Sequence, residues 1–276
     1  MLYTGLMYQL MPSMIALEKV LSRFENSQLS RLFGVGRIVN QIVNVARFTP
    51  LVVNHKDQET FDGILRNIVL LLRAADVDFG YLYDEELYAG ALAHDEGMCG
   101  AFERHALRVH NLFRRHGVRR VITVDPHTTN VLRSVYPKVI HEDRLEVNSY
   151  LEVLAERRTK PVKLREAQAA IHDSCVYARH EGIVEEPREL LRRAGLDAVE
   201  PEYSGKLTFC CGGPIESLFP SKARSIAEAR IKQLAAASEN VITMCPICLV
   251  NLRGAAAGNG VSVKDISGCL AEAHCD

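Results

Sequence analysis

Two six-residue stretches of this chain are nearly the same: Val-Ile-Thr-Val-Asp-Pro at 121–126 and Val-Ile-Thr-Met-Cys-Pro at 241–246. Each stretch follows an amphipathic, helix-like segment, and each precedes a Leu-Arg pair, at 132–133 and at 252–253. Self-similarity at a long, fixed spacing indicates an internal repeat. The chain of 276 residues therefore divides into two related halves, which we expect at 1–158 and 159–276.

The repeat extends upstream of these stretches. Leu-Leu-Leu-Arg-Ala-Ala at 70–75 resembles Leu-Leu-Arg-Arg-Ala-Gly at 190–195. After each comes an apolar, strand-like run and then a turn with glycine, Tyr-Ala-Gly at 88–90 and Cys-Cys-Gly at 210–212. The first half is longer because of an insertion at about 26–60, and the charged stretch 156–161, which ends in proline, is the expected linker.

Strand-like and helix-like patterns alternate along both halves. The β-branched runs at 118–124 and 241–244 predict short strands, and an apolar stripe precedes each of them. Such alternation favours βαβ units with parallel strands. We therefore expect an α/β fold of two pseudo-repeated halves, each a small parallel sheet flanked by helices. The two predicted helix faces are Phe102, Ala106, Val109 and Phe113, and Ile226, Ala229, Ile231, Leu234 and Ala235.

The composition excludes several classes of protein. Hydrophobic residues make up 47% of the chain and charged residues 24%, and the formal net charge is -1, so nothing indicates nucleic acid as a partner. The apolar start of the chain has no basic region and no cleavage site of a secretory signal. We expect a cytoplasmic, reducing location, where clustered cysteines are metal ligands or redox groups rather than structural disulfides.

Five of the eight cysteines form one pattern in the second half: Cys175, the adjacent pair Cys210 and Cys211, and the C-x-x-C pair Cys245 and Cys248. The glycines at 212 and 213 allow the sharp turn that an adjacent pair needs to serve one site. Thiolates suit iron–sulfur clusters or zinc, but a fifth thiolate exceeds the four of a zinc site. The pattern therefore favours a cluster, with zinc or unligated thiols as alternatives. We expect the site at the carboxyl end of a strand, near the junction of the halves.

This spacing resembles that of the cysteine-rich CCG domain. The domain occurs in heterodisulfide reductase catalytic subunits, in related subunits of sulfate-reduction membrane complexes, and in iron–sulfur subunits of lactate and glycolate oxidases. His172-Asp-Ser-Cys175 with Arg179 resembles the His-Asp-Pro-Cys segment of the family, with Ser174 in place of proline. The resemblance implies that all five cysteines ligate a non-cubane 4Fe–4S cluster, or that four of them ligate a cubane. We expect His172 and Arg179 to tune that cluster.

The family usually carries its motif twice, but the first copy here lacks the cysteines. Leu6 stands at the first cysteine position, Tyr-Ala-Gly at 88–90 replaces Cys-Cys-Gly, and Asp-Pro-His-Thr at 125–128 replaces Cys-Pro-x-Cys. The resemblance therefore implies that 1–158 is a degenerate half without cluster ligands and that 159–276 binds the cluster. Asp125 and His127 remain candidates for binding a metal or handling a proton, or they form a hydrogen-bonded turn at a strand end.

The resemblance implies a subunit of an oxidoreductase complex, whose cluster performs thiol/disulfide redox chemistry and exchanges electrons with a ferredoxin-like or flavin-containing partner. The first alternative is an electron-relay subunit of a lactate or glycolate oxidase-type dehydrogenase, or of a membrane redox complex, with no substrate of its own. The second is a structural zinc scaffold. Under the membrane-complex alternative, the chain is peripheral to the membrane.

The remaining cysteines, a basic stretch and the apolar insertion each have a structural explanation and a functional one. We expect Cys99 to be packed, Cys269 to lie in the core on the last helix, and Cys275 to be a surface thiol. The arginines and histidines within 103–120 form a solvated helix face or a docking surface for an acidic electron donor. The apolar insertion at 31–53 covers the core of its own half, docks a partner or rests on a membrane.

Overall fold

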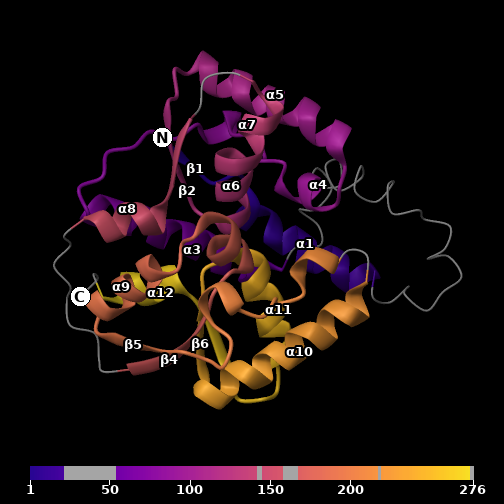
Figure 1. The fold of residues 1–276 in the computed structure, drawn as a ribbon, viewed down its shortest axis with the longest axis vertical. Coiled ribbons are helices and arrows are strands. Elements are labelled where there is room, and N and C mark those ends of the chain that lie inside the picture. The colour runs from indigo at the N-terminus through magenta and orange to yellow at the C-terminus, as the bar shows by residue number, and fades with distance from the viewer. Residues whose placement is uncertain (22–53, 142–144, 158–166, 217–218, 274–276) are drawn as a thin grey trace, which may run out of the picture.

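Each half of the chain builds its own parallel sheet, and helices cover both sheets (Figure 1). The computed structural model describes residues 1–21, 54–141, 145–157, 167–216 and 219–273. The α/β fold with two small parallel sheets is as predicted.

The first half contains β1 (Leu2–Tyr3), α1 (Met7–Leu21), α3 (His55–Ala74), η3 (Tyr83–Glu85), α4 (Ala91–Asp95), α5 (Cys99–Arg115), β2 (Arg120–Thr123), α6 (Pro126–Asn130), η4 (Val131–Val135), α7 (Tyr136–Val139), β3 (Glu146–Ser149) and α8 (Tyr150–Glu156). The second half contains β4 (Ala167–His172), η5 (Val176–Glu181), α9 (Glu185–Arg193), β5 (Leu196–Val199), η6 (Gly205–Leu207), η7 (Gly213–Ile215), α10 (Pro220–Ala237), β6 (Asn240–Thr243), α11 (Pro246–Ala256), β7 (Ser262–Asp265) and α12 (Ile266–Glu272).

The registers of the two sheets repeat one another. The strand order is β1-β2-β3 in the first sheet and β5-β4-β6-β7 in the second, with every pair parallel. Tyr3 stands opposite Thr123 in the first sheet, and His172 stands opposite Thr243 in the second. The two Val-Ile-Thr stretches are therefore equivalent central strands, β2 and β6.

The fourth strand, β5, has no equivalent strand in the described part of the first half. The sequence predicted a strand-like run after residue 75, and this prediction was wrong: 77–82 is not a strand. This segment still lies beside the edge strand β1, because the backbone nitrogen of Leu2 donates a hydrogen bond of 2.9 Å to the carbonyl oxygen of Gly80.

The repeated Leu-Arg pairs make equivalent contacts in the two halves. Arg133 donates from Nε to the carbonyl oxygen of Val147 on β3, and Arg253 donates from Nε to the carbonyl oxygen of Val263 on β7, both at 2.9 Å. Each arginine thus ties the helical segment after the central strand to the neighbouring strand. The sequence repeat therefore corresponds to a structural repeat.

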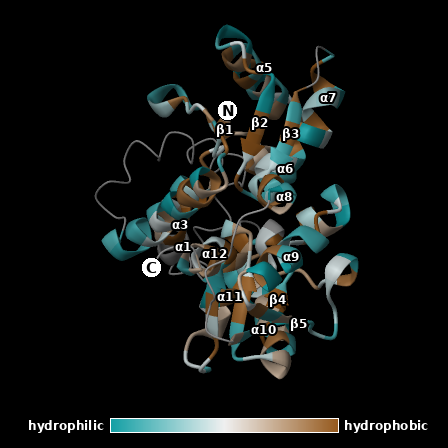
Figure 2. Cartoon of the chain, turned by 90° about the vertical axis from the view of Figure 1, so that its left-hand side faces the viewer, coloured by the Kyte–Doolittle hydropathy of each residue, from teal (hydrophilic) through white to brown (hydrophobic). Residues whose placement is uncertain are grey.

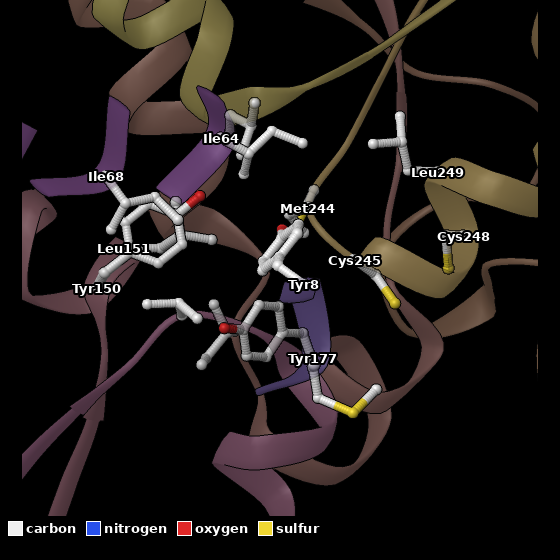
Figure 3. Close-up of a cluster of buried hydrophobic side chains, with 14 of the residues drawn as sticks. Tyr8, Ile64, Ile68, Tyr150, Leu151, Tyr177, Met244, Cys245, Cys248 and Leu249 are labelled. Carbon is white, nitrogen blue, oxygen red and sulfur yellow. The ribbon is translucent and has the colours of Figure 1, made fainter. Parts of the chain in front are cut away.

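Two tyrosines cross between the halves in the same reciprocal way. Tyr8 of α1 donates to Asp265, which begins α12 of the second half, at 2.9 Å. Tyr177 of η5 hydrogen-bonds at 2.7 Å to Ser149, which begins α8 of the first half. All four side chains are buried, so each half closes the strand ends of the other. Figure 3 shows Tyr8 and Tyr177 near each other in the shared core.

Helices from both halves meet along this junction. The pairs in contact are α1 with α11, α3 with α12, α6 with η5, and α8 with α9. The buried apolar side chains of both halves form one continuous cluster. Figure 2 shows hydrophobic residues on the central strands, with hydrophilic residues on outer helices such as α5.

The predicted helix faces had different outcomes. Phe102, Ala106, Val109 and Phe113 are buried on α5, as predicted. On α10 the predicted face was partly wrong, because Ile226 and Ala229 are exposed. The buried face of α10 instead includes a residue that no hydrophobic pattern would select: its members are Ala223, Ala227, Arg230, Ile231 and Leu234.

Two other predictions concern residues outside the described ranges. These are the apolar insertion at 31–53 and most of the linker at 156–161. The last described element of the first half is α8, and the first described element of the second half is β4.

Candidate functional site

The C-x-x-C pair lies where the central strand of the second half passes into a helix. Cys245 is the N-cap of α11, Pro246 follows it in the first turn, and Cys248 lies on the same turn. Proline fits the first helical turn because the backbone N–H groups there have no partner within the helix. Figure 3 shows the two sulfur atoms on the same side of the start of α11. Both side chains are buried, with exposed fractions of 0% and 3%.

The Cys-Cys-Gly turn is held against α10 and α11 by its glycines. Gly212 has a left-handed conformation with φ of 87°, which permits the sharp turn after Cys211. A Cβ at Gly212 would lie 2.5 Å from the carbonyl oxygen of Ala223, and a Cβ at Gly213 would lie 2.2 Å from Ile247 Cγ2. Close packing, as well as conformation, therefore requires glycine here.

We expect Gly212→Ala to displace the turn and to reduce both stability and metal content. A left-handed conformation costs a residue with a Cβ about 1–2 kcal/mol, and the contact with Ala223 adds to that cost. Gly258→Ala is the matched control, because Gly258 has φ of 83° but no atom within 4 Å of a Cβ there. Thermal melting and metal analysis of the two variants check this. Equal losses in both would contradict the role of the close contact.

The five cysteines of the pattern converge from three separate parts of the second half. Cys175 begins η5, the pair Cys210 and Cys211 precedes η7, and Cys245 and Cys248 begin α11. Their thiols form an unbroken series of side-chain contacts in the order 175, 210, 211, 248, 245. The structure thus brings together every cysteine that the sequence pattern singled out.

The contacts divide the five sulfurs into donors and acceptors. Hydrogen bonds from Cys175 and Cys211, together with Gly212 N at 3.3 Å, lower the pKa of the Cys210 thiol. Burial opposes ionisation of Cys245, but hydrogen bonds from Cys248 and His127 outweigh it and hold the pKa of Cys245 well below its usual value. The hydrogen bonds within this group thus favour ionisation at Cys210 and Cys245. The thiolate is the form in which cysteine binds a soft metal centre.

His172 lies against the same sulfurs. One of its imidazole nitrogens lies within 4.8 Å of the sulfur atoms of Cys211 and Cys248, which also lie within 4.8 Å of one another. The imidazole is 1% exposed. Burial and the neighbouring Arg230 lower the pKa of His172 to about 3, so the ring is neutral at physiological pH. His172 thus lies beside the cysteines, as we expected, and its imidazole is uncharged.

Arg179, the other residue that we expect to tune the cluster, lies beside the segment that leads to Cys210. It is exposed, and its guanidinium donates to the carbonyl oxygens of Lys206, at 3.0 Å, and Thr208. These carbonyls belong to the segment that leads to Cys210. Arg179 therefore supports the approach to the Cys-Cys-Gly turn, and its hydrogen bonds go to backbone rather than to sulfur.

In the first half, the polar residues Asp125 and Thr128 occupy the positions equivalent to Cys245 and Cys248. Asp125, equivalent to Cys245, caps α6 by accepting from Thr128 N at 2.9 Å, as expected for a hydrogen-bonded turn at a strand end. Burial raises the pKa of Asp125 to about 6. A Cβ at Gly5 would lie 2.3 Å from Thr128 Oγ1, so this corner is filled by protein atoms.

His127 connects the first half with the thiols. Its Nδ1 lies 2.8 Å from Asp95 Oδ2, and the imidazole also hydrogen-bonds to Cys245. Burial lowers the pKa of His127, but these two partners outweigh burial and raise it well above its usual value. The thiol group therefore lies at the junction of the two halves, where the sequence predicted the site.

The cysteines outside the pattern lie apart from these contacts. Cys269 is buried on α12, as predicted, and Cys275 lies outside the described residues. The prediction for Cys99 was wrong: it is the first residue of α5 and is exposed at that end of the helix. The arginines at 104, 108, 114, 115, 119 and 120 are all exposed.

Sequence reasoning missed two residues that touch the site, Arg230 and Asp95. Arg230 lies in the buried face of α10 and contacts His172. The sequence does contain one signal for Arg230. The helical spacing of a buried face is complete only when Arg230 is counted among its members, which are residues 223, 227, 230, 231 and 234. No sequence signal connects Asp95 with His127.

Comparison with known proteins gives a consistent set of relatives. Residues 169–253 match the family described as Cysteine-rich domain (CCG). The chain is 33% identical over 224 residues to "Probable membrane-anchored ferredoxin" of Chromohalobacter salexigens, covering 76% of this chain and 33% of that protein. It is 30% identical over 221 residues to "EtfAB:quinone oxidoreductase" of Syntrophomonas wolfei, covering 74% and 31%. It is 26% identical over 220 residues to a subunit of the dihydromethanophenazine:CoB--CoM heterodisulfide reductase of Methanosarcina mazei, covering 74% and 53%. The chain thus spans about a third of the length of the first two relatives.

Proposed function

We propose that this chain is an iron–sulfur subunit of an oxidoreductase complex. It carries a cysteine-rich CCG domain, and its homologues include heterodisulfide reductase subunits and iron–sulfur oxidoreductases. It holds one 4Fe–4S cluster through Cys175, Cys210, Cys211, Cys245 and Cys248. The single observation that carries the proposal is the unbroken series of contacts among these thiols. Residues 159–276 form the cluster-binding half, and 1–158 form the degenerate one.

The donor set fits a cluster better than a zinc ion. A structural zinc site takes four ligands, and a fifth thiol in the same series would stay unligated. The set is all sulfur, which suits iron–sulfur clusters. The site also has a buried cation, because Arg230 is 0% exposed and lies within electrostatic reach of Asp173 and Cys248. A cluster with several thiolate ligands is negatively charged and would offset that cation.

When bound, the cluster would supply single-electron transfer, and in the leading form of the proposal the electrons reduce a disulfide. The residues of this chain hold the thiolates, keep water away from them and control the charge around them. Four of the groups at the site are almost fully buried: Cys211, Cys245, Cys248 and His172. Cys175 and Cys210 are partly exposed, so we propose that a substrate or an electron-transfer partner approaches on their side.

Electron relay without a substrate is the second candidate, and one observation favours it. In the degenerate half, Asp125 and Thr128 fill the corner that is equivalent to the thiol site. This half therefore offers no second cluster that would share a substrate with the first. Under both candidates the chain exchanges electrons with a ferredoxin-like or flavin-containing partner, either in the cytoplasm or at the periphery of a membrane complex. In the described ranges, no helix is both long and apolar enough to span a bilayer.

The cluster itself is tested by metal analysis of anaerobically purified protein. We expect about four iron atoms per chain, an equal amount of acid-labile sulfide, no zinc, and an EPR signal that appears or disappears on reduction. One zinc ion per chain without sulfide would contradict the proposal and favour the structural scaffold.

The two redox candidates are separated by mixing the reduced protein with a disulfide. If the chain has a thiol/disulfide activity, one disulfide should reoxidise the clusters of two protein molecules without any partner, because its cleavage to two thiols takes two electrons and two protons from the solvent. If the chain is a relay, only a ferredoxin or flavoprotein partner should do so. The readout is the optical and EPR spectrum of the cluster.

A further inference from the structure

Arg230 is the largest side chain that is fully withdrawn from solvent in the described residues. Its guanidinium donates to His172 Nδ1 at 3.1 Å, to Gln233 Oε1 at 3.0 Å and to Thr208 Oγ1 at 3.4 Å. All three acceptors are uncharged. Placing a cation in the interior is costly unless an anion offsets it. The buried carboxylate of Asp173 lies within electrostatic reach of Arg230, but it is already paired with Arg188 through two hydrogen bonds. The position of Arg230 therefore needs a reason beyond packing.

The hydrogen bond from Arg230 determines which nitrogen of His172 carries the proton. A guanidinium is always protonated and can only donate, so Nδ1 of His172 must present its lone pair. In a neutral imidazole the proton is then on Nε2. The contact with Arg230 thus makes His172 an N–H donor at Nε2.

The Nε2 atom of His172 is buried and has no hydrogen-bond partner in the protein. An unpaired buried donor costs free energy comparable to that of a lost hydrogen bond. Sulfurs are available as acceptors, because one nitrogen of the imidazole lies within 4.8 Å of the sulfurs of Cys211 and Cys248. As a donor, Nε2 has no lone pair for a metal, so the imidazole is not a fourth ligand beside these cysteines.

We propose that Arg230 is a positioning residue that fixes His172 as an N–H donor, and that His172 Nε2 hydrogen-bonds to the sulfur of the iron–sulfur centre held at Cys211 and Cys248. The inference rests on the proposed cluster and goes beyond it, because it assigns a cause for the reduction potential of that cluster. Hydrogen bonds to the sulfurs are among the factors that set such potentials. Reduction adds negative charge, and an N–H donor stabilises that charge, so this hydrogen bond raises the potential.

The test is an EPR-monitored redox titration of the full chain, purified anaerobically with its cluster. In His172→Phe we expect the ratio of reduced to oxidised cluster, at a fixed solution potential, to fall about tenfold. A tenfold change corresponds to about 59 mV for a one-electron couple. In Arg230→Met we expect a shift in the same direction and at least as large, because this variant also removes a buried positive charge.

Gln233→Ala is the matched control. It removes the bond to Nη1 of Arg230 but leaves the contact of Arg230 with His172, so the potential should stay at the wild-type value. Wild-type potentials in both His172→Phe and Arg230→Met, with the cluster intact, would overturn the inference. A shift in His172→Phe alone would overturn the role of Arg230.

A spectroscopic measurement on the unmodified sequence covers the case in which a variant does not fold. Protein labelled with ¹⁵N-histidine and reduced should show, by pulsed EPR, two weak couplings of the kind that hydrogen-bonded imidazoles give, one from His172 and one from His127, which hydrogen-bonds to Cys245. A coupling of the strength that a direct iron–nitrogen bond gives, or fewer than two weak couplings, would overturn the inference. Failure of the proposed function is a distinct result, because the protein would then contain no iron or sulfide.

Discussion

Cys211→Ser should abolish the cluster and leave the chain without its iron and acid-labile sulfide. Cys211 is the middle member of the thiol series, because it contacts both Cys210 and Cys248. It is 2% exposed, so no water-filled space is available for another ligand to take its place. A serine hydroxyl has nearly the same shape, but its hard oxygen is a poor substitute for a thiolate. The measurement is iron and sulfide per chain after anaerobic purification.

Cys269→Ser is the matched control for this prediction. Cys269 is also buried, with an exposed fraction of 6%, but it lies on α12 and outside the thiol series. This variant should keep wild-type iron and sulfide. Full iron content and an unchanged EPR spectrum in Cys211→Ser would remove Cys211 from the ligand set. Equal loss of iron in both variants would attribute the effect to a disturbed core.

Arg188→Met should produce the largest loss of stability that we expect from a residue outside the thiol series. Asp173, which is 1% exposed, accepts from Arg188 Nη1 at 2.8 Å, from Arg188 Nη2 at 3.0 Å and from Gly205 N at 2.6 Å. Removing the arginine leaves the buried carboxylate without its hydrogen-bonded charge partner, because the nearby Arg230 donates to His172, Gln233 and Thr208 instead. Breaking such a pair costs about 3–5 kcal/mol.

The same change four residues along the helix provides the control. Arg192 also lies on α9, but its side chain is 74% exposed and its ion pair with Glu189 is on the surface. Surface pairs contribute about 0–1 kcal/mol, so Arg192→Met should be nearly neutral. Denaturant unfolding of both variants gives the comparison. Similar free energies of unfolding for the two would contradict the importance of the buried pair.

The pair of Arg188 and Asp173 also matters for the cysteines. Asp173 is two residues before Cys175, and through Gly205 it holds the segment that leads to Cys210. We therefore expect Arg188→Met to lose iron during purification as well as stability. Adding Asp173→Asn to this variant removes the unpaired charge and should recover part of the stability.

The repeat made most of the fold predictable from the sequence. Matching stretches at 121–126 and 241–246 became the equivalent strands β2 and β6, and the paired arginines at 133 and 253 make equivalent contacts. Local patterns sufficed here because a short β-branched run before a helix carries its own signal. The run after residue 75 carried a weaker signal, and only one hydrogen bond to β1 remains where a strand was expected.

The cysteines of the site were predictable, but their polar surroundings were not. Cysteine spacing is a local property that the sequence displays directly. The contacts of Arg230 with His172, of Asp95 with His127, and of His127 with Cys245 join segments from different elements or different halves. Hydrophobic patterns assign an arginine to the surface, and so they placed the buried face of α10 incorrectly around Arg230.

The most direct test of the central claim is a crystal structure of the anaerobically purified protein, with diffraction data collected on both sides of the iron absorption edge. We predict anomalous iron density in bonding contact with the sulfurs of Cys210, Cys211, Cys245 and Cys248, and with or directly beside that of Cys175. A single anomalous peak whose height does not change across the iron edge, but rises across the zinc edge, would contradict the account. So would a thiol group without any metal density.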